Sequence, residues 1–307
     1  MTGKSRILHM QDRRVFDRFL GLEKHRLSVY AFPNIYIWKG LFEIFWMIID
    51  GELCVFFKDG ISCFMYLPPL GIEKSPLVIE KAFAVMAEHN RDASLSRIEN
   101  VEEGDIARYK AWGYDSVLKS CDYLCKQTDM AGLRGDRFKS KRSGVNYFVK
   151  HYHGEYASFF PESGEACIAL YNRWMHERGI GNKDPVYTGM MRDGLNSLKI
   201  LLGDYDRLHC TGRVVKIDGR IKAFTFGFPV CEDTFCVLYE IADRAVKGLS
   251  QFIFRNFCAE FKEYACINIM DDSGLENLKK VKRSYYPAYA VPAYLVQRKN
   301  RGGLRHG

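Results

Sequence analysis

The sequence lacks the cysteine and histidine patterns that would indicate a metal or disulfide framework. Its ten cysteines contain no CxxC pair. His151 and His153 have no partner ligands at zinc spacing, so two surface imidazoles are favoured over a metal site. We therefore expect no metal centre, and unpaired, mostly buried thiols in a reducing cytoplasm.

Long apolar runs are also absent. The most hydrophobic segment, residues 41–49, contains Glu43 and stops at Asp50. It is well short of the roughly 20 apolar residues that a membrane-spanning helix needs. No apolar signal segment follows the first six residues. These absences favour a cytoplasmic location, and the apolar segment is predicted to be a strand.

The composition allows large folded cores. Of 307 residues, 47% are hydrophobic and 14% aromatic, enough for two domains or one large one. The formal net charge of +8 points to an anionic partner such as nucleic acid, nucleotide phosphate or a lipid surface. Many basic proteins bind none of these, so charge alone does not identify the partner.

Residues 213–261 are predicted to form a hairpin, a strand and a helix. Asp218-Gly219 separates two β-rich runs, which is a strong hairpin signal, and a third run covers residues 235–241. After Lys247-Gly248 the apolar residues recur every four positions, which predicts a helix.

A strand and a helix are predicted next. Residues 266–270 form a short apolar run that ends at Asp271-Asp272. Ser273 with Glu276 three residues later matches a capping box, so a helix is expected to begin there. Pro287 is expected to end it.

The first part of the chain has a similar order of elements. After a helix over residues 13–22, a three-strand meander is predicted over residues 42–66, with turns at Asp50-Gly51 and Asp59-Gly60. A helix over residues 76–88 and a strand over residues 94–101 follow. The two Ile-Asp-Gly hairpin turns are offset by 218 − 50 = 168 residues, which indicates an internal repeat.

A basic helix is predicted over residues 134–152, between the two copies. Its apolar residues share one face, and Lys139, Lys141, Arg142 and Lys150 cover the rest. A nucleic-acid contact and a merely solvated basic face are both compatible with this pattern. Two further helices, over residues 165–178 and 186–202, are predicted to follow.

The strand-to-helix order of residues 213–287 resembles the second half of the GNAT acyltransferase fold, and the detail resembles the catalytic domain of the phosphatidylglycerol lysyltransferase family. The residues that carry this resemblance are Leu238-Tyr-Glu240-Ile-Ala-Asp243, Lys247-Gly248, Ile267-Asn268, Asp272, Gly274-Leu275, Leu278, Lys282 and Ser284-Tyr285-Tyr286-Pro287. Residues 30–38 and 139–148 also look like that family, so the resemblance covers nearly the whole chain.

The resemblance implies an α/β (α+β) protein of two tandem GNAT-like halves, each with a mostly antiparallel sheet flanked by helices. We expect an N-terminal half at residues 1–128. The C-terminal half is expected at residues 129–307 and includes a basic helical linker at 129–204.

In a GNAT-like site, backbone N–H groups of a splayed strand polarise an acyl carbonyl while an amine or hydroxyl attacks it. Glu240 lies near the end of that strand, so it is the expected general base or amine anchor. Lys247 and Gly248 stand where a helix N-terminus can receive a phosphate. In acetyl-CoA-using members the corresponding loop resembles Arg/Gln-x-x-Gly-x-Gly/Ala. The loop here has only one of the glycines, which argues against CoA and leaves room for a larger donor such as the aminoacyl-tRNA that the lysyltransferase branch uses.

The other expected site residues follow the last buried strand. Asn268, Asp271 and Asp272 are predicted to hold a substrate amine, although helix capping alone would explain Asp272. Lys282 is the member of its basic cluster expected to face the cleft, and Tyr285 is expected to donate a proton or to pack as an aromatic. Lys139 and Arg142 are expected to contact a tRNA carrier, and Asp271 and Tyr285 to stand in for Glu240 in catalysis.

The implied activity is transfer of an acyl or aminoacyl group from a carrier to a hydroxyl or amine, similar to lysyl-phosphatidylglycerol synthesis. The co-substrate is acyl-CoA or aminoacyl-tRNA, with no tightly bound cofactor, and the acceptor is an anionic lipid or a small molecule. A CoA-dependent N-acetyltransferase of a small amine and a non-catalytic RNA- or acidic-lipid-binding module are the alternatives. A soluble, stand-alone form in the cytoplasm or at the inner membrane surface is expected, with the oligomeric state open.

Overall fold

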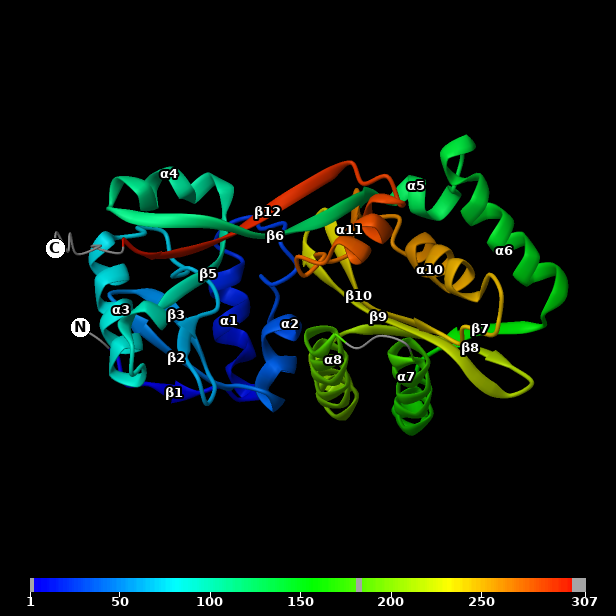
Figure 1. The fold of residues 1–307 in the computed structure, drawn as a ribbon, viewed down its shortest axis with the longest axis horizontal. Coiled ribbons are helices and arrows are strands. Elements are labelled where there is room, and N and C mark those ends of the chain that lie inside the picture. Colours follow the sequence, from blue (N-terminus) through cyan, green and yellow to red (C-terminus); the bar gives the residue numbers. More distant parts are fainter. Residues whose placement is uncertain (1–2, 181–183, 300–307) are drawn as a thin grey trace, which may run out of the picture. The chain divides into compact units, whose positions relative to one another are not determined.

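The computed structural model describes residues 3–180 and 184–299, which divide into two compact units (Figure 1). The first unit takes in residues up to 30, residues 42–121 and residues from 291 onwards, and the second takes in residues 31–41 and 122–290. Each unit combines a mostly antiparallel sheet with helices, so the predicted fold class is confirmed. The domain bounds predicted from the sequence remain a proposal.

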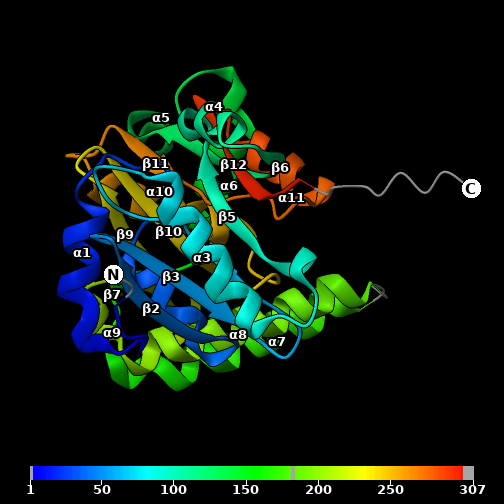
Figure 2. The ribbon, with the colours of Figure 1, turned by 90° about the vertical axis from the view of Figure 1, so that its left-hand side faces the viewer.

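The first unit contains the predicted meander. Its strands lie in the order β1-β2-β3-β4-β5-β12, and only β4 and β5 pair in parallel. Helix α3 packs on β2, β3 and β4 (Figure 2). The elements are β1 (Arg6–Ile7), α1 (Arg13–Leu20), β2 (Glu43–Ile49), β3 (Glu52–Lys58), β4 (Cys63–Met65), α3 (Pro76–His89), β5 (Arg97–Glu102), α4 (Glu103–Ala111) and β12 (Tyr289–Arg298).

In the second unit the strands lie in the order β6-β11-β10-β9-β8-β7, and only β10 and β11 pair in parallel. Helix α10 covers one face of the sheet and α7 packs on the other (Figure 1). The strands are β6 (Tyr114–Lys126), β7 (Gly154–Ser158), β8 (Thr211–Ile217), β9 (Arg220–Cys231), β10 (Thr234–Ala242) and β11 (Cys266–Asn268). The helices are α2 (Phe32–Tyr36), α5 (Gln127–Gly132), α6 (Lys139–His151), α7 (Gly164–Gly179), α8 (Pro185–Gly203), α9 (Tyr205–Leu208), α10 (Leu249–Glu260) and α11 (Glu276–Arg283).

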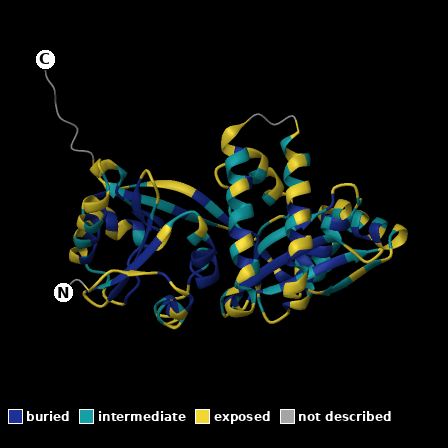
Figure 3. Cartoon of the chain, turned by 90° about the horizontal axis from the view of Figure 1, so that it is seen from below, coloured by how far each residue is buried: buried dark blue, intermediate teal, exposed yellow. Residues whose placement is uncertain are grey.

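Five short 3₁₀ segments complete the described elements. They are η1 (Met10–Asp12), η2 (Ile37–Gly40), η3 (Ala93–Leu95), η4 (Asp136–Phe138) and η5 (Pro161–Ser163). Helices α7 and α8 alternate buried and exposed residues, as amphipathic helices do (Figure 3). Within residues 3–180 and 184–299, the longest apolar helical stretches fall short of what crossing a membrane requires.

Both repeats contain the predicted hairpin and the order strand, helix, strand that follows it. Asp50 and Gly51 have φ of 48° and 89°, and Asp218 and Gly219 have φ of 50° and 71°. Both residues of each turn are therefore left-handed, as a two-residue type I′ hairpin turn requires. The repeat of elements predicted from the sequence is therefore present in the structure.

Each unit is completed by a strand from the other half of the sequence. Strand β6 follows β5 and α4, yet its last residues, 124–126, pair with β11 in the second unit. Strand β12 follows α11, yet it pairs with β5 in the first unit. The sequence patterns predicted neither β6 nor β12.

The main core of the second unit lies where α10 meets β10, α5 and α6. Phe235 of β10 stacks on Phe261 with ring centroids 3.6 Å apart, and Phe257 of α10 is fully buried. Phe138 and Val145 add the buried face of the predicted basic helix. Burying each such side chain contributes about 1.5–3 kcal/mol, so α6 and α10 are held firmly beside each other.

The capping box predicted at Ser273 and Glu276 is wrong. Helix α11 begins at Glu276 itself, and no side chain caps it. Ser273 and Gly274 are left-handed, with φ of 50° and 71°, so the chain is still turning there. Asp272 organises this turn: its Oδ1 accepts a hydrogen bond from Gly274 N at 3.0 Å.

Candidate functional site

A cavity opens in the second unit where the parallel strands β10 and β11 diverge. The strands pair only over Thr234–Cys236 and Cys266–Asn268, and β10 then continues to Ala242. The cavity has a volume of about 670 Å³ and is lined by residues 237–244 and 269–271, among others. This volume lies in the range of small-molecule and cofactor sites.

A bulge in β10 shapes the wall of this cavity. The register between β10 and β9 shifts between Val237 and Tyr239, so Leu238 is the extra residue. A bulge bends its strand locally and turns backbone groups away from the ladder. Opposite, Met270 has φ of 67°, a left-handed conformation that is rare for its residue type and is held by a bond from its N–H to Asn268 Oδ1 at 2.7 Å.

Glu240 lies on β10 in the wall of the cavity. Its Oε1 accepts a hydrogen bond from Ser250 Oγ at 2.5 Å. Burial raises the pKa of Glu240, while the Ser250 hydrogen bond and the nearby cations Lys282 and Lys141 oppose the rise. A carboxyl group whose pKa is raised towards neutral is a better proton acceptor at physiological pH.

Lys282 reaches the same cavity from α11. Its Nζ donates a hydrogen bond to the carbonyl oxygen of Ile269. Burial lowers the pKa of Lys282, and the carboxylates of Asp271, Asp122 and Glu240 oppose this effect. Asp271 lines the cavity beside it. The cavity therefore places the carboxyl groups of Glu240 and Asp271 in the same lining as a lysine whose pKa is lowered by burial.

Tyr285 lines the cavity, and Lys141 of α6 lies against its ring. The Tyr285 ring lies 4.9 Å from the ring of Phe254, and Lys141 Nζ lies 3.3 Å from the Tyr285 centroid and 3.1 Å from Ser284 Oγ. Burial raises the pKa of Tyr285 well above its usual value, so its hydroxyl stays protonated and can donate. The sequence had placed Lys141 only on the basic helix face.

The N-terminus of α10 faces the cavity through Ser250 and Gln251. The first N–H groups of a helix have no partner within it and can receive an anion. Gly248 precedes them with φ of 83°, and a Cβ there would lie 2.0 Å from Gly144 O of α6. Lys247 is exposed, with Nζ 4.4 Å from the Tyr147 ring centroid.

The cavity lining also includes an aromatic and cationic pair from α7 that the sequence patterns did not single out for function. The Arg178 guanidinium lies 4.7 Å from the ring centroid of Trp174, and both residues line the cavity. Arg178 also donates to Tyr187 OH at 3.2 Å. No local motif marks these residues, because α7 joins the cavity only through the fold.

Three of the predicted site residues bond to other parts of the protein, and a fourth is exposed. Asn268 is fully buried and donates to Asp122 Oδ2 at 2.7 Å, and Asp272 accepts from Tyr123 OH at 2.6 Å. Arg142 donates to the carbonyl oxygens of Leu133 and Gly135, which hold it at the end of α5. Lys139 is exposed on α6. Their predicted binding roles stay predictions.

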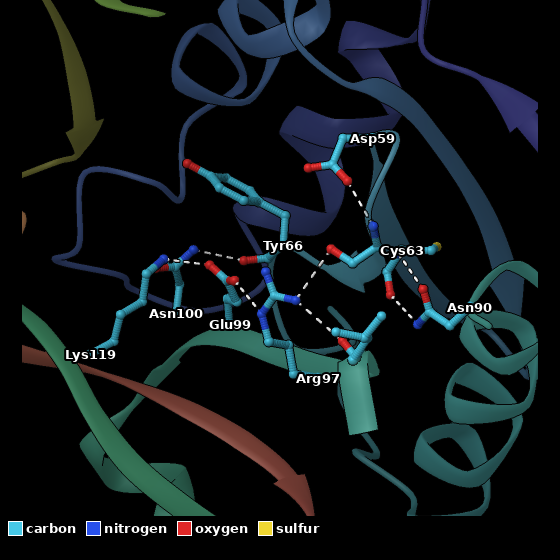
Figure 4. Close-up of polar contacts among 10 residues, drawn as sticks. Asp59, Cys63, Tyr66, Asn90, Arg97, Glu99, Asn100 and Lys119 are labelled. Carbon is cyan, nitrogen blue, oxygen red and sulfur yellow. Dashed lines mark hydrogen bonds and ion pairs between the residues drawn. The ribbon is translucent and has the colours of Figure 1, made fainter. Parts of the chain in front are cut away.

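The equivalent strands of the first unit are bridged by side chains. Asn100 stands 268 − 100 = 168 residues before Asn268, the same offset as the two hairpin turns. Its Nδ2 donates to the Tyr66 carbonyl oxygen at 2.8 Å, and Lys119 Nζ bonds to both Asn100 Oδ1 and Glu99 (Figure 4). The Asn100 bond ties β5 to the end of β4, and the Lys119 bonds tie β5 to β6, whereas β10 and β11 separate.

The chain has a tandem GNAT-like fold, with the cavity in its second unit. The chain belongs to the family described as phosphatidylglycerol lysyltransferase, C-terminal, whose model matches residues 21–297. This match confirms the resemblance inferred from the sequence, and the protein is an enzyme of the acyl- and aminoacyl-transferring class. No curated protein sequence matches the chain.

Solved structures agree on the fold. A conserved protein of unknown function from Bacteroides thetaiotaomicron is 25% identical, with a TM-score of 0.85, over 97% of this chain and 100% of that one. L-PGS from Bacillus licheniformis is 20% identical, with a TM-score of 0.65, over 94% and 93%. A tandem GNAT protein from the clavulanic acid biosynthesis pathway is 9% identical, with a TM-score of 0.54, over 96% and 98%.

Proposed function

We propose that the second unit transfers an aminoacyl group from an aminoacyl-tRNA to the hydroxyl of an anionic lipid such as phosphatidylglycerol. The observation that carries the proposal is the Glu240 carboxyl group, which lies in the cavity on the part of β10 that extends beyond its pairing with β11, and whose pKa is raised by burial. Membership of the lysyltransferase family supports this choice of donor and acceptor. The enzyme would then work at the surface of an anionic membrane.

The proposed step is an acyl exchange between two oxygens. Glu240 takes the proton of the acceptor hydroxyl, whose oxygen forms a bond to the ester carbonyl carbon of the donor. The backbone at the Leu238 bulge stabilises the negative charge on the carbonyl oxygen. The ester bond to the tRNA ribose then breaks, and the ribose oxygen takes a proton from Tyr285. Glu240 and Tyr285 regain their starting states by exchanging protons with solvent.

The loop before α10 favours a tRNA donor over CoA. The segment Arg244–Ser250 contains Gly248 as its only glycine, and Gly248 is packed against Gly144 O. In members of the fold that use acetyl-CoA, the corresponding loop lies at the pyrophosphate and resembles a pattern with two glycines. The rival reading, a CoA-dependent transferase of a small amine, is supported by the helix N-terminus itself, which suits a pyrophosphate equally well.

The proposal is tested with the purified chain, radiolabelled aminoacyl-tRNA and phosphatidylglycerol vesicles. We expect label in the lipid phase with the wild type, and transfer slower by about 10²–10⁴-fold with Glu240→Gln. Acyl transfer from acetyl-CoA to small amines, with no lipid product, would establish the CoA reading instead. Saturable RNA or vesicle binding without transfer from any donor would show a non-catalytic binding module.

A further inference from the structure

Resting on the proposed function, we propose that Ser250 is a positioning residue for the reaction: its hydroxyl holds one oxygen of the Glu240 carboxyl group, so that the other oxygen is presented to the acceptor hydroxyl. The observation behind this is the hydrogen bond from Ser250 Oγ to Glu240 Oε1 at 2.5 Å, between two residues that both line the cavity. Ser250 acts through Glu240 and does not itself react. The sequence patterns did not single it out.

The Glu240 carboxyl group has no second partner that could fix it. Within the part of the chain that the structure describes, no other side chain hydrogen-bonds to it and no ion pair joins it to a cation. Its other oxygen, Oε2, has no hydrogen bond there either, and it is not fully buried. The Ser250 bond therefore orients the carboxyl group and leaves Oε2 open to the cavity.

Both residues stand on backbone that the core of the second unit holds in place. Ser250 is the second residue of α10, and Ile253 anchors that end of the helix in an apolar cluster. Next to Glu240, the Tyr239 carbonyl oxygen accepts from Thr225 Oγ1 at 2.8 Å, and the Tyr239 hydroxyl donates to a carbonyl oxygen of α8 at 2.9 Å. A hydrogen bond between two such fixed elements can hold a reacting group in a productive geometry.

The Ser250 bond also influences when Glu240 can accept a proton. Burial raises the pKa of Glu240, and the hydrogen bond from Ser250, which favours the ionised carboxylate, opposes that rise. Other titratable groups act on Glu240 from the surrounding elements: Lys282 of α11, Lys141 of α6, Arg178 of α7, Cys258 of α10 and Tyr285. Removing the Ser250 hydroxyl leaves all of these groups in place, so it should raise the pKa of Glu240 further.

The test is a double-mutant cycle on single-turnover transfer from total tRNA charged with radiolabelled amino acids to phosphatidylglycerol vesicles. Its members are the wild type, Ser250→Ala, Glu240→Gln and the double variant. We expect Ser250→Ala to slow transfer by about 10- to 100-fold, the effect of losing one hydrogen bond to a charged group. In the Glu240→Gln background the same change should have almost no further effect, because Ser250 acts only through the base.

Two further variants and a pH profile separate this role from a purely structural one. Ser250→Thr keeps the hydroxyl and should restore transfer, and Ser158→Ala on the exposed side of β7 is the control that should leave transfer unchanged. The acid limb of kcat/KM should move to higher pH in Ser250→Ala, because the base then ionises at higher pH. In Ser250→Thr the limb should stay with the wild type.

A wild type that transfers, with a folded Ser250→Ala that keeps both its rate and its acid limb, would overturn this inference and leave the proposed function standing. Additive losses in the double variant would overturn it as well. If Ser250→Ala does not fold, Ser250→Cys replaces it in every comparison, since a thiol of similar size is only a weak donor. Transfer from acetyl-CoA alone would overturn the proposed donor, and the same variants measured with acetyl-CoA would then decide the role of Ser250. No transfer from either donor would overturn the proposed function and this inference together.

Discussion

Glu240 combines a place in the cavity wall with a raised pKa, and the proposed mechanism depends on both. Glu240→Gln keeps the size of the side chain and its ability to accept from Ser250 but cannot take a proton. We expect turnover to fall by about 10²–10⁴-fold, the contribution typical of a general base. Single-turnover transfer measures this, with exposed Glu263→Gln as the control. Near-normal turnover would move the base role to Asp271 or Tyr285.

The raised pKa of Glu240 also predicts a pH dependence of activity. The base must be ionised, so kcat/KM should fall as the pH drops through the raised pKa. The midpoint of this fall should lie at a pH above 4.5, the ordinary pKa of a Glu side chain. A kcat/KM profile between pH 4 and 8 measures this. An acid limb at or below the ordinary value would show that another group controls the rate.

The raised pKa of Glu240 should also affect the stability of the protein. Ionising Glu240 increases activity as the pH rises, but it lowers stability. A carboxyl group whose pKa is raised in the folded state favours folding below its unfolded pKa, and this contribution is lost as the pH rises through the folded pKa. Ionising Glu240 therefore costs stability near neutral pH. Thermal unfolding of Glu240→Gln should show a smaller loss of stability between pH 4.5 and 7 than the wild type. Parallel curves for the two proteins would contradict this.

At the scale of elements, local signals were enough for the hairpins and amphipathic helices. The dipeptide Asp218-Gly219 favours a hairpin turn without help from the rest of the chain. In α10 the buried apolar residues, Phe257 among them, recur at helical spacing. Strand β6 was missed because Leu124 pairs with Asn268, which lies 268 − 124 = 144 residues away. A strand that gains its partner only through the fold carries no local signal of pairing.

The same distinction applies to the candidate site. Glu240, Lys247, Gly248 and Lys282 lie close together along one strand-loop-helix stretch of the sequence or match the family motif, so the sequence pointed to them. Arg178 comes from α7, far from that motif, and it reaches the cavity only because α7 packs on β10 and β9. Its role could not be inferred from residue spacing.

Gly248 gives a prediction at the start of α10. Gly248→Ala puts a side chain at φ of 83° and a Cβ 2.0 Å from Gly144 O, so α10 and α6 must move apart. We expect a loss of about 2 kcal/mol or more in the free energy of unfolding. Gly189→Ala within α8, where no atom lies within 4 Å of the new Cβ, is the control and should gain about 0.5–1 kcal/mol. Urea unfolding measures both. Equal effects would show that the contact between α10 and α6 adapts.

At the scale of the whole molecule, two features matter: the exchange of strands between the repeats and the excess of basic residues. Because β12 belongs to the first unit and the end of β6 to the second, neither half of the sequence completes its own sheet. The 45 basic and 37 acidic residues leave a net charge of +8. Charge of this kind acts over a Debye length, so it supports association with an anionic partner.

The last prediction concerns tRNA binding by α6. Of the basic residues predicted to contact tRNA, Arg142 is held by backbone carbonyl oxygens, whereas Lys139 is exposed, as is Lys150 on the same helix. Each phosphate contact steepens the fall of log affinity with log salt by about 0.7–0.9. Lys139→Ala with Lys150→Ala should therefore reduce the slope by about 1.4–1.8 if both lysines contact phosphates.

Fluorescence titrations of labelled tRNA between 50 and 200 mM salt, about the range over which such contacts are resolved, measure this slope. Arg91→Ala with Lys110→Ala removes two exposed charges from the first unit and is the control, which should leave the slope nearly unchanged. Equal changes in the two double variants would mean that tRNA responds to net charge without a defined contact on α6. If tRNA binding does not depend on salt and CoA binds saturably, acyl-CoA would be favoured over aminoacyl-tRNA as the donor.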